Sequence, residues 1–155
     1  MDWRKNMFNQ IAGASLVENS VVDSVPLNFE GQVFASKICL EMTGLDKGVK
    51  REELLKRMAS NNINLYVTFS ECAPMLPIES MEVGTICLTG NNHHYFKGTE
   101  LENYLVVTRE DDVVAIADKI KYALENKEKI FKLYKAWKEN YDIISKKSVQ
   151  EFLDM

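Results

Sequence analysis

Short apolar runs rich in β-branched residues alternate along the chain with segments whose apolar residues recur every three or four positions. The helical period is clear over residues 7–17, which predicts a helix there. Strands are then predicted at 21–27, 40–44, 63–69, 86–89 and 104–108, and helices at about 32–39, 51–61, 74–83 and 113–124. Asp111 and Asp112 stand where they can cap the last of these helices. The alternation predicts an α/β domain with a mostly parallel sheet and helices on both faces.

The first predicted helix has no strand before it. In an alternating α/β domain such a helix follows a strand, and residues 1–6 do not read as one. The chain therefore looks cut from something longer. We expect residues 1–155 to form a single domain, with residues 127–155 as a terminal helical extension.

That extension again has a helical period. Its apolar stripe consists of Ile130, Leu133, Tyr134, Trp137 and Tyr141, and lysines cover much of the remaining surface. We expect the helix to pack through this stripe. Part of the stripe could be exposed where a neighbouring domain would cover it, and a basic, aromatic helix over 127–147 could instead contact an anionic membrane surface.

Composition narrows the class of protein. A chain of 155 residues, 46% hydrophobic and 27% charged, has the size and balance of one globular domain. Its three cysteines cannot all pair within the chain and lack metal-ligand spacing, which favours a reducing cytoplasm. No apolar run is long enough to cross a bilayer. A net charge of -4 gives no reason to expect a general nucleic-acid binder.

Ligands of parallel α/β sheets bind outside the carboxyl ends of the strands. The loops to consider are therefore 43–46, 70–74, 89–94 and 108–111. In the second loop Glu71 ends a predicted strand, and Glu79 lies about two turns into the following helix. A helix start suits a diphosphate, and nearby carboxylates accept hydrogen bonds from sugar and ribose hydroxyls. This combination predicts a nucleotide-sugar site.

The segment 70–84, followed by the strand at 86–89, resembles the signature of retaining GT-B glycosyltransferases, in which two glutamates are separated by seven residues. From about residue 5 to residue 124, the order of elements is similar to the C-terminal, donor-binding domain of those enzymes (glycosyltransferase group 1, family 4-like). The resemblance implies a Rossmann-like fold. It also implies that the preceding domain of the enzyme, which holds most of the acceptor, is absent from this chain.

The resemblance also implies roles for individual residues. Glu71 would be the catalytic residue that contacts the donor sugar, and Glu79 would contact the ribose. Arg4 and Lys5, just before the first predicted helix, match the basic residues that hold the donor diphosphate. The implied reaction is sugar transfer with retention at the anomeric carbon, without a metal or other cofactor.

This sequence departs from the many relatives that carry glycines after the first glutamate. Pro74 and Pro77 are both expected in the first helical turn, where a missing N–H is tolerated. Diphosphate contacts then fall to the N–H groups of Cys72, Ala73, Met75 or Leu76. The neighbouring loops add further donor-binding candidates, which are Gly44, Leu45, Asn91, Asn92 and His93. The adjacent histidines at 93 and 94 lack further ligands at metal-binding spacing.

We therefore expect the nucleotide-sugar-binding domain of a bacterial-type retaining glycosyltransferase, acting on a glycan or glycolipid acceptor in polysaccharide biosynthesis and inactive alone. Its expected place is the cytoplasm, with the inner face of the membrane as a further possibility. The alternative is a non-catalytic nucleotide-sugar-binding or regulatory α/β module. A dinucleotide-binding or Walker-type site is disfavoured because no glycine-rich motif of either kind is present.

Overall fold

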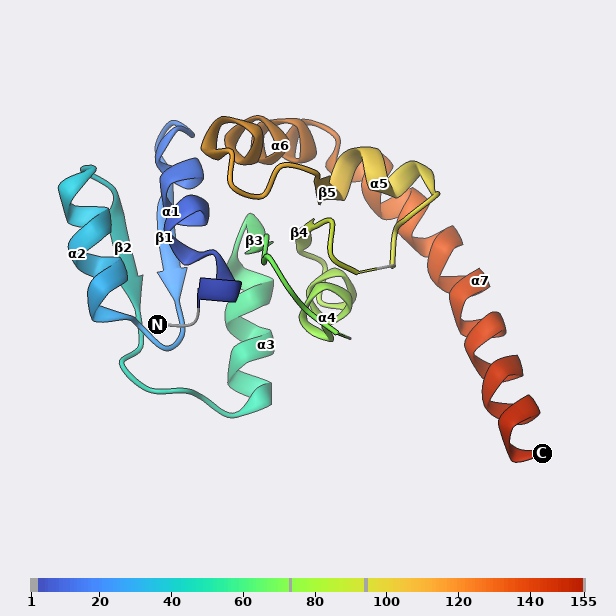
Figure 1. Cartoon of the computed structure of the whole chain (residues 1–155). Helices are drawn as coiled ribbons and strands as arrows, with labels where there is room; N and C mark the ends of the chain where they lie inside the picture. Colours follow the sequence, from blue (N-terminus) through green and yellow to red (C-terminus); the bar gives the residue numbers. More distant parts are fainter. Residues whose placement is uncertain (1–2, 73, 94, 155) are drawn as a thin grey trace.

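The computed structural model describes residues 3–72, 74–93 and 95–154. Helices and strands alternate along almost the whole of this part of the chain (Figure 1). A short 3-10 helix, η1 (Trp3–Lys5), is followed by the helices α1 (Met7–Ser15), α2 (Phe29–Lys37), α3 (Arg51–Ser60), α4 (Leu76–Glu82), α5 (Glu100–Leu105), α6 (Val113–Glu125) and α7 (Lys127–Leu153). The strands are β1 (Val21–Ser24), β2 (Glu41–Gly44), β3 (Ile63–Tyr66), β4 (Ile86–Gly90) and β5 (Val106–Val107).

The strands form two parallel sheets. One holds β1 and β2, with Val21 opposite Glu41; the other has the order β3-β4-β5, with Ile63 opposite Ile86. The predicted α/β fold with parallel strands and flanking helices is confirmed. The division into two sheets was not predicted, because spacing along the chain does not reveal which strands pair.

The main core surrounds β4, which is buried at all five positions. Figure 1 shows α6 and α4 on opposite sides of this strand. Aliphatic residues such as Leu88, Leu105 and Ile116 fill the space between them. A smaller core under β1 and β2 is built from Ile11, Ala14, Ala35 and Leu40. The helix α1 connects the two cores because it packs against both α2 and α6.

Several predicted elements have other ends in the structure: the strands expected at 21–27 and 63–69 end at Ser24 and Tyr66, and the helix expected at about 32–39 is α2 (Phe29–Lys37). Two further predictions were wrong at residues 104–108 and at the start of α4. The strand expected at 104–108 is reduced to β5, because Tyr104 and Leu105 end the helix α5. Glu100 and Glu102 lie in its first turn, where negative charge favours a helix, and the apolar residues form its buried face. The helix expected from residue 74 begins at Leu76, so Pro74 precedes it and only Pro77 lies in its first turn.

The terminal helix α7 is packed in its first half and exposed in its second. Ile130 and Tyr134 are buried, and the Trp137 ring meets Phe96 edge-on at 5.1 Å. Beyond Tyr141 the helix runs away from the rest of the molecule (Figure 1), and its apolar residues are exposed. Within the described ranges no helix combines the length and apolar character needed to span a membrane.

Candidate functional site

The carboxyl ends of β3 and β5 meet the start of α1 through one buried side chain. Asn6 adopts a left-handed backbone conformation, with φ of 52°, just before the helix. Its Nδ2 donates to the carbonyl of Val67 at 2.9 Å and to that of Glu110 at 2.6 Å. Asparagine tolerates this conformation better than most residues. Asn6 thus fixes η1 and α1 against two loops that are distant in sequence.

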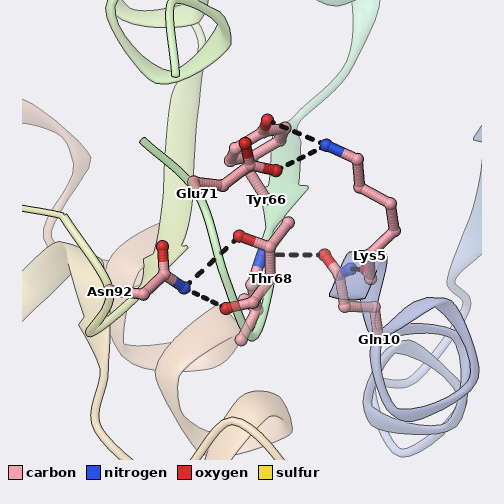
Figure 2. Close-up of polar contacts among 7 residues, drawn as sticks. Lys5, Gln10, Tyr66, Thr68, Glu71 and Asn92 are labelled. Atoms are coloured by element: carbon pink, nitrogen blue, oxygen red, sulfur yellow. Dashed lines mark hydrogen bonds and ion pairs between the residues drawn. The ribbon is translucent and has the colours of Figure 1, made fainter. Parts of the chain in front are cut away.

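Lys5 and Glu71 form an ion pair at this edge (Figure 2), with 2.5 Å between Lys5 Nζ and Glu71 Oε1. The ammonium also lies 3.4 Å from the Tyr66 hydroxyl oxygen and 5.4 Å from the centre of the Tyr66 ring. Only 15% of the Glu71 side chain is exposed, against 51% for Lys5. The carboxylate is therefore largely enclosed, and the lysine screens it from solvent.

These contacts determine the protonation states of Glu71, Lys5 and Tyr66. Partial burial acts to raise the pKa of Glu71, but hydrogen bonds from Lys5 and Tyr66 and the charges of Lys5 and Arg4 outweigh it and lower that pKa. The hydrogen bond to Glu71 in turn raises the pKa of Lys5. Burial, followed by the hydrogen bond to Glu71, raises the pKa of Tyr66. At neutral pH the site holds a carboxylate, an ammonium and a neutral phenol.

A second set of hydrogen bonds supports the ion pair. Gln10, on α1, donates through Nε2 to the Lys5 carbonyl at 2.7 Å and accepts from the Val67 N–H at 2.9 Å. Asn92 Nδ2 donates to the Thr68 carbonyl and lies 3.4 Å from the Thr68 hydroxyl (Figure 2). The start of α1 and the loops after β3 and β4 are thus held together by side-chain amides.

The end of β4 lies so close to the loop after β3 that a side chain would not fit between them. A Cβ added to Gly90 would lie 2.4 Å from the Thr68 carbonyl oxygen. The next residue, Asn91, donates its N–H to Glu110 Oε1 at 2.7 Å. Glycine is needed here for space, and the Glu110 carboxylate joins the loop after β5 to the same edge.

Glu79 lies in the first turn of α4 and binds a different cation. Arg51, the first residue of α3, reaches Glu79 Oε1 with Nε at 2.8 Å and Nη2 at 2.7 Å. Both contacts fall on the same oxygen. The Glu79 side chain is 18% exposed, whereas that of Arg51 is 70% exposed. The two signature glutamates are therefore both largely enclosed and both paired with a cation that is mostly in solvent.

Several other residues of the predicted site lie at or near this edge. Arg4 accepts a hydrogen bond from the Phe69 N–H at 2.8 Å through its carbonyl oxygen, beside the loop that carries Glu71. Cys72 is exposed, and Met75 is the exposed residue that precedes α4. Leu76 begins that helix. Ala73 lies outside the described residues.

Gly44 is the last residue of β2, in the other sheet, and Leu45 follows it. Leu45 donates its N–H to the Ser24 carbonyl at 3.2 Å and accepts from the Leu27 N–H at 2.6 Å. A Cβ at Gly44 would lie 1.9 Å from the same Ser24 carbonyl oxygen. Both residues are thus fixed at the carboxyl end of β1 and β2, on the opposite flank of the sheet edge from Asn92.

His93 is buried, with 8% of the residue exposed. Its ring lies 5.2 Å from that of Tyr95 and 6.4 Å from that of Phe96, and its Nδ1 accepts from the Tyr95 N–H at 3.4 Å. The imidazole therefore belongs to the aromatic cluster beneath the loop. Within the described ranges no group of three His, Cys, Asp or Glu side chains is arranged to hold a metal ion.

Among the residues of the site that the sequence did not indicate are Asn6, Gln10, Arg51 and Tyr66. Tyr66 is the last residue of β3, but the strand was predicted to run to residue 69, so its place at the strand end was not visible in the sequence. Gln10 and Arg51 carried no signal, because each is one of many polar residues on a helix. Their contacts depend on how α1 and α3 pack against β3 and α4.

Comparison with solved structures shows where this fold occurs. The catalytic domain of cholesterol-alpha-glucosyltransferase from Helicobacter pylori superposes with a TM-score of 0.65 at 15% sequence identity, covering 88% of this chain and 89% of that one. No protein-family model and no curated protein matches the sequence. The chain therefore has a Rossmann-like, GT-B-like fold of the kind found in a glycosyltransferase catalytic domain.

Proposed function

We propose that this chain is the nucleotide-sugar-binding domain of a retaining glycosyltransferase. The observation that carries the proposal is the ion pair between Lys5 and Glu71, which joins residues 66 positions apart at the carboxyl edge of the sheet. That edge is where ligands of open α/β sheets bind. A glycosyltransferase-like fold with a cation and a carboxylate side by side at this edge suits a ligand that has both phosphates and hydroxyls.

In this proposal Lys5 binds the diphosphate of the donor and Glu71 binds its sugar. An ammonium has three N–H donors, and Lys5 directs them toward Glu71 and Tyr66 while half of its side chain remains exposed. It can turn toward a diphosphate without leaving the site, and Arg4 adds positive charge nearby. Glu71, held ionised by its lowered pKa, accepts hydrogen bonds from the sugar hydroxyls.

Glu79 takes the ribose in this scheme. Arg51 contacts only Oε1 of its carboxylate, so Oε2 can accept a hydrogen bond from a ribose hydroxyl. Arg51 also holds the side chain in one orientation, which lowers the entropy lost when the ligand binds. Because Arg51 is mostly exposed, a nucleotide could also displace it at little cost.

The chemistry follows from these roles. As the bond between the anomeric carbon and the diphosphate breaks, negative charge grows on the leaving phosphate and positive charge on the sugar ring. Lys5 and Arg4 stabilise the first, while Glu71 orients the sugar and stabilises the second. An acceptor hydroxyl, bound mainly by another domain, then attacks the anomeric carbon with retention and gives its proton to the leaving diphosphate oxygen. On this scheme the 155-residue chain binds donor but transfers no sugar alone.

The test is binding of UDP- and GDP-sugars to the isotope-labelled protein, followed by NMR. We expect saturable shifts for one base, centred on the loop after β3. Glu79→Ala should weaken that binding about 10- to 100-fold, because it removes a hydrogen bond to a charged group worth about 1.5–3 kcal/mol. Glu139→Ala, on the exposed face of α7, is the matched control and should change nothing.

Two outcomes would contradict the proposal. One is absence of binding across the panel at millimolar ligand, and the other is binding that Glu79→Ala leaves intact. Binding accompanied by robust sugar transfer from this chain alone would support the donor site. It would refute the proposal that transfer requires another domain. Binding that supports no transfer even beside a complementary acceptor domain would favour the non-catalytic module.

A further inference from the structure

The ion pair between Arg51 and Glu79 uses only part of the arginine side chain. A guanidinium carries five N–H donors in a planar arrangement. Nε donates to Glu79 Oε1 at 2.8 Å, and Nη2 lies 2.7 Å from the same oxygen. The outer end of the group, formed by Nη1 and the remaining N–H of Nη2, has no partner in the described part of the chain. Arg51 therefore offers a second fork of two parallel N–H groups.

This second fork is both open and held in position. The Arg51 side chain is 70% exposed, so a ligand can reach it. Its two contacts fall on a carboxylate that is largely enclosed, in the first turn of α4. They restrict how far the plane of the guanidinium can turn. A fork that is positioned before the ligand arrives loses less entropy when the ligand binds.

The position of Arg51 relates the fork to one part of the donor, and this step rests on the function proposed above. In that scheme the carboxylate of Glu79 takes the ribose, while Lys5, paired with Glu71, takes the diphosphate. The ribose carries the diphosphate and the base at opposite ends of its ring. Because the diphosphate extends toward Lys5, the base is the group that lies beside Glu79 and its arginine.

The bases differ in the acceptors that they offer to such a fork. Guanine presents the acceptors O6 and N7 side by side, and arginine binds this pair through two parallel hydrogen bonds. Adenine has N7 beside an amino group, whose N–H groups would oppose those of a guanidinium. Uracil has a single oxygen at the corresponding edge. Of these bases, only guanine matches both N–H groups of the fork.

A phosphate or carboxylate would also fit the fork, but an exposed apolar side chain nearby in sequence favours a base. Leu45, which begins the connection from β2 to Arg51, is exposed, and Ser24 and Leu27 fix its backbone through hydrogen bonds. Apolar side chains of this kind suit the flat face of a base. The same connection also contains lysines, which attract anions, so binding has to be compared between ligands that carry equal phosphates.

We propose that Arg51 selects guanine, so that the donor of this domain is a GDP-sugar. The Nε edge of the guanidinium holds Glu79 in place for the ribose, as in the free protein. The outer fork, Nη1 and Nη2, donates to N7 and O6 of the base. Arg51 can remain on Glu79 while the nucleotide binds, because the two sets of contacts use different edges of the same group. It is therefore a specificity residue, and it takes no part in the transfer step.

The test titrates GDP, UDP, ADP and 7-deaza-GDP, which lacks the N7 acceptor, into the isotope-labelled full chain and follows binding by NMR. All four carry the same diphosphate. GDP should bind at least about tenfold more tightly than each of the others. Arg51→Lys keeps a cation beside Glu79 but lacks the fork, so it should abolish the difference between GDP and 7-deaza-GDP. Lys56→Ala, an exposed cation on the same helix, is the control and should leave every affinity unchanged.

The ratios between nucleotides distinguish this role from a purely structural one. If Arg51 only held Glu79 or attracted phosphates, Arg51→Lys would weaken all four nucleotides by the same factor. That result would overturn the selection of guanine, as would 7-deaza-GDP that binds as tightly as GDP, or tighter binding of UDP or ADP. In each of these cases nucleotides still bind, so the proposed donor site would stand. Failure of all four to bind at millimolar concentration would overturn both proposals.

Discussion

Replacing Gly13 with alanine tests how closely α1 must approach α6. A Cβ at this position would lie 2.6 Å from Ile116 Cγ2, 2.8 Å from Ile116 Cβ and 3.2 Å from the Val113 carbonyl oxygen. The first distance is about 1 Å inside the optimal separation of two carbons. Ile116 is fully buried, and its Cβ is attached to the backbone. A rotamer change therefore cannot relieve the overlap, and the two helices must move apart.

The net effect follows from two opposing terms. Overpacking of a core costs about 1–3 kcal/mol, and the fixed Cβ places Gly13→Ala in the upper part of that range. In a helix, alanine stabilises the folded state by about 1 kcal/mol relative to glycine. We therefore expect the free energy of unfolding to fall by about 1–2 kcal/mol. Urea unfolding followed by circular dichroism measures this directly.

Gly31, in the first turn of α2, provides the matched control. A Cβ there would meet the Met7 methyl carbon at 3.0 Å, the far end of a flexible side chain. Gly31→Ala should therefore keep the gain in helix propensity and leave the protein equally or slightly more stable. If Gly13→Ala proved as stable as the wild type, the close packing of α1 on α6 would be refuted.

Two further predictions concern side chains that titrate or react. Because the folded pKa of Glu71 lies below its ordinary value of 4.5, the ionised side chain stabilises the fold above that pH and loses this effect as the pH falls through the lowered pKa. Glu71→Gln should thus cost about 1 kcal/mol at pH 7 and progressively less below pH 4.5 in urea unfolding; a gap that persists in acid would contradict the ion pair. Burial raises the pKa of the Cys87 thiol, whereas Cys39 and Cys72 are exposed. A thiol reagent should therefore label two cysteines in the native protein and the third only in denaturant; rapid labelling of Cys87 would contradict its burial.

Local pattern was enough to predict most elements. The apolar run that became β4 and the 3.6-residue period of α6 are properties of contiguous sequence, and so is the cap of α6, where Asp112 accepts from Val114 and Ala115 as expected. Local pattern failed at Tyr104 and Leu105. An apolar pair fits a buried strand and the buried face of a short helix equally well.

The candidate site was only partly visible in the same way. Glu71 and Glu79 were selected because both lie in one contiguous motif, and Lys5 because it stands just before the first predicted helix. Their partners were not visible. Arg51 reaches Glu79 across 28 positions, and nothing in its immediate surroundings distinguishes it from other basic residues at helix starts.

Pairing in space was decided by tertiary structure alone. That the strands divide into two sheets and that Asn6 joins Val67 to Glu110 both depend on contacts between segments far apart in the chain. The periodicity of apolar residues predicts which face of a helix or strand is buried, and capping residues predict where a helix ends. Neither pattern predicts which other element packs against that face, because many apolar surfaces of the chain have similar composition. The pairing depends on how all of these surfaces pack together in the folded chain.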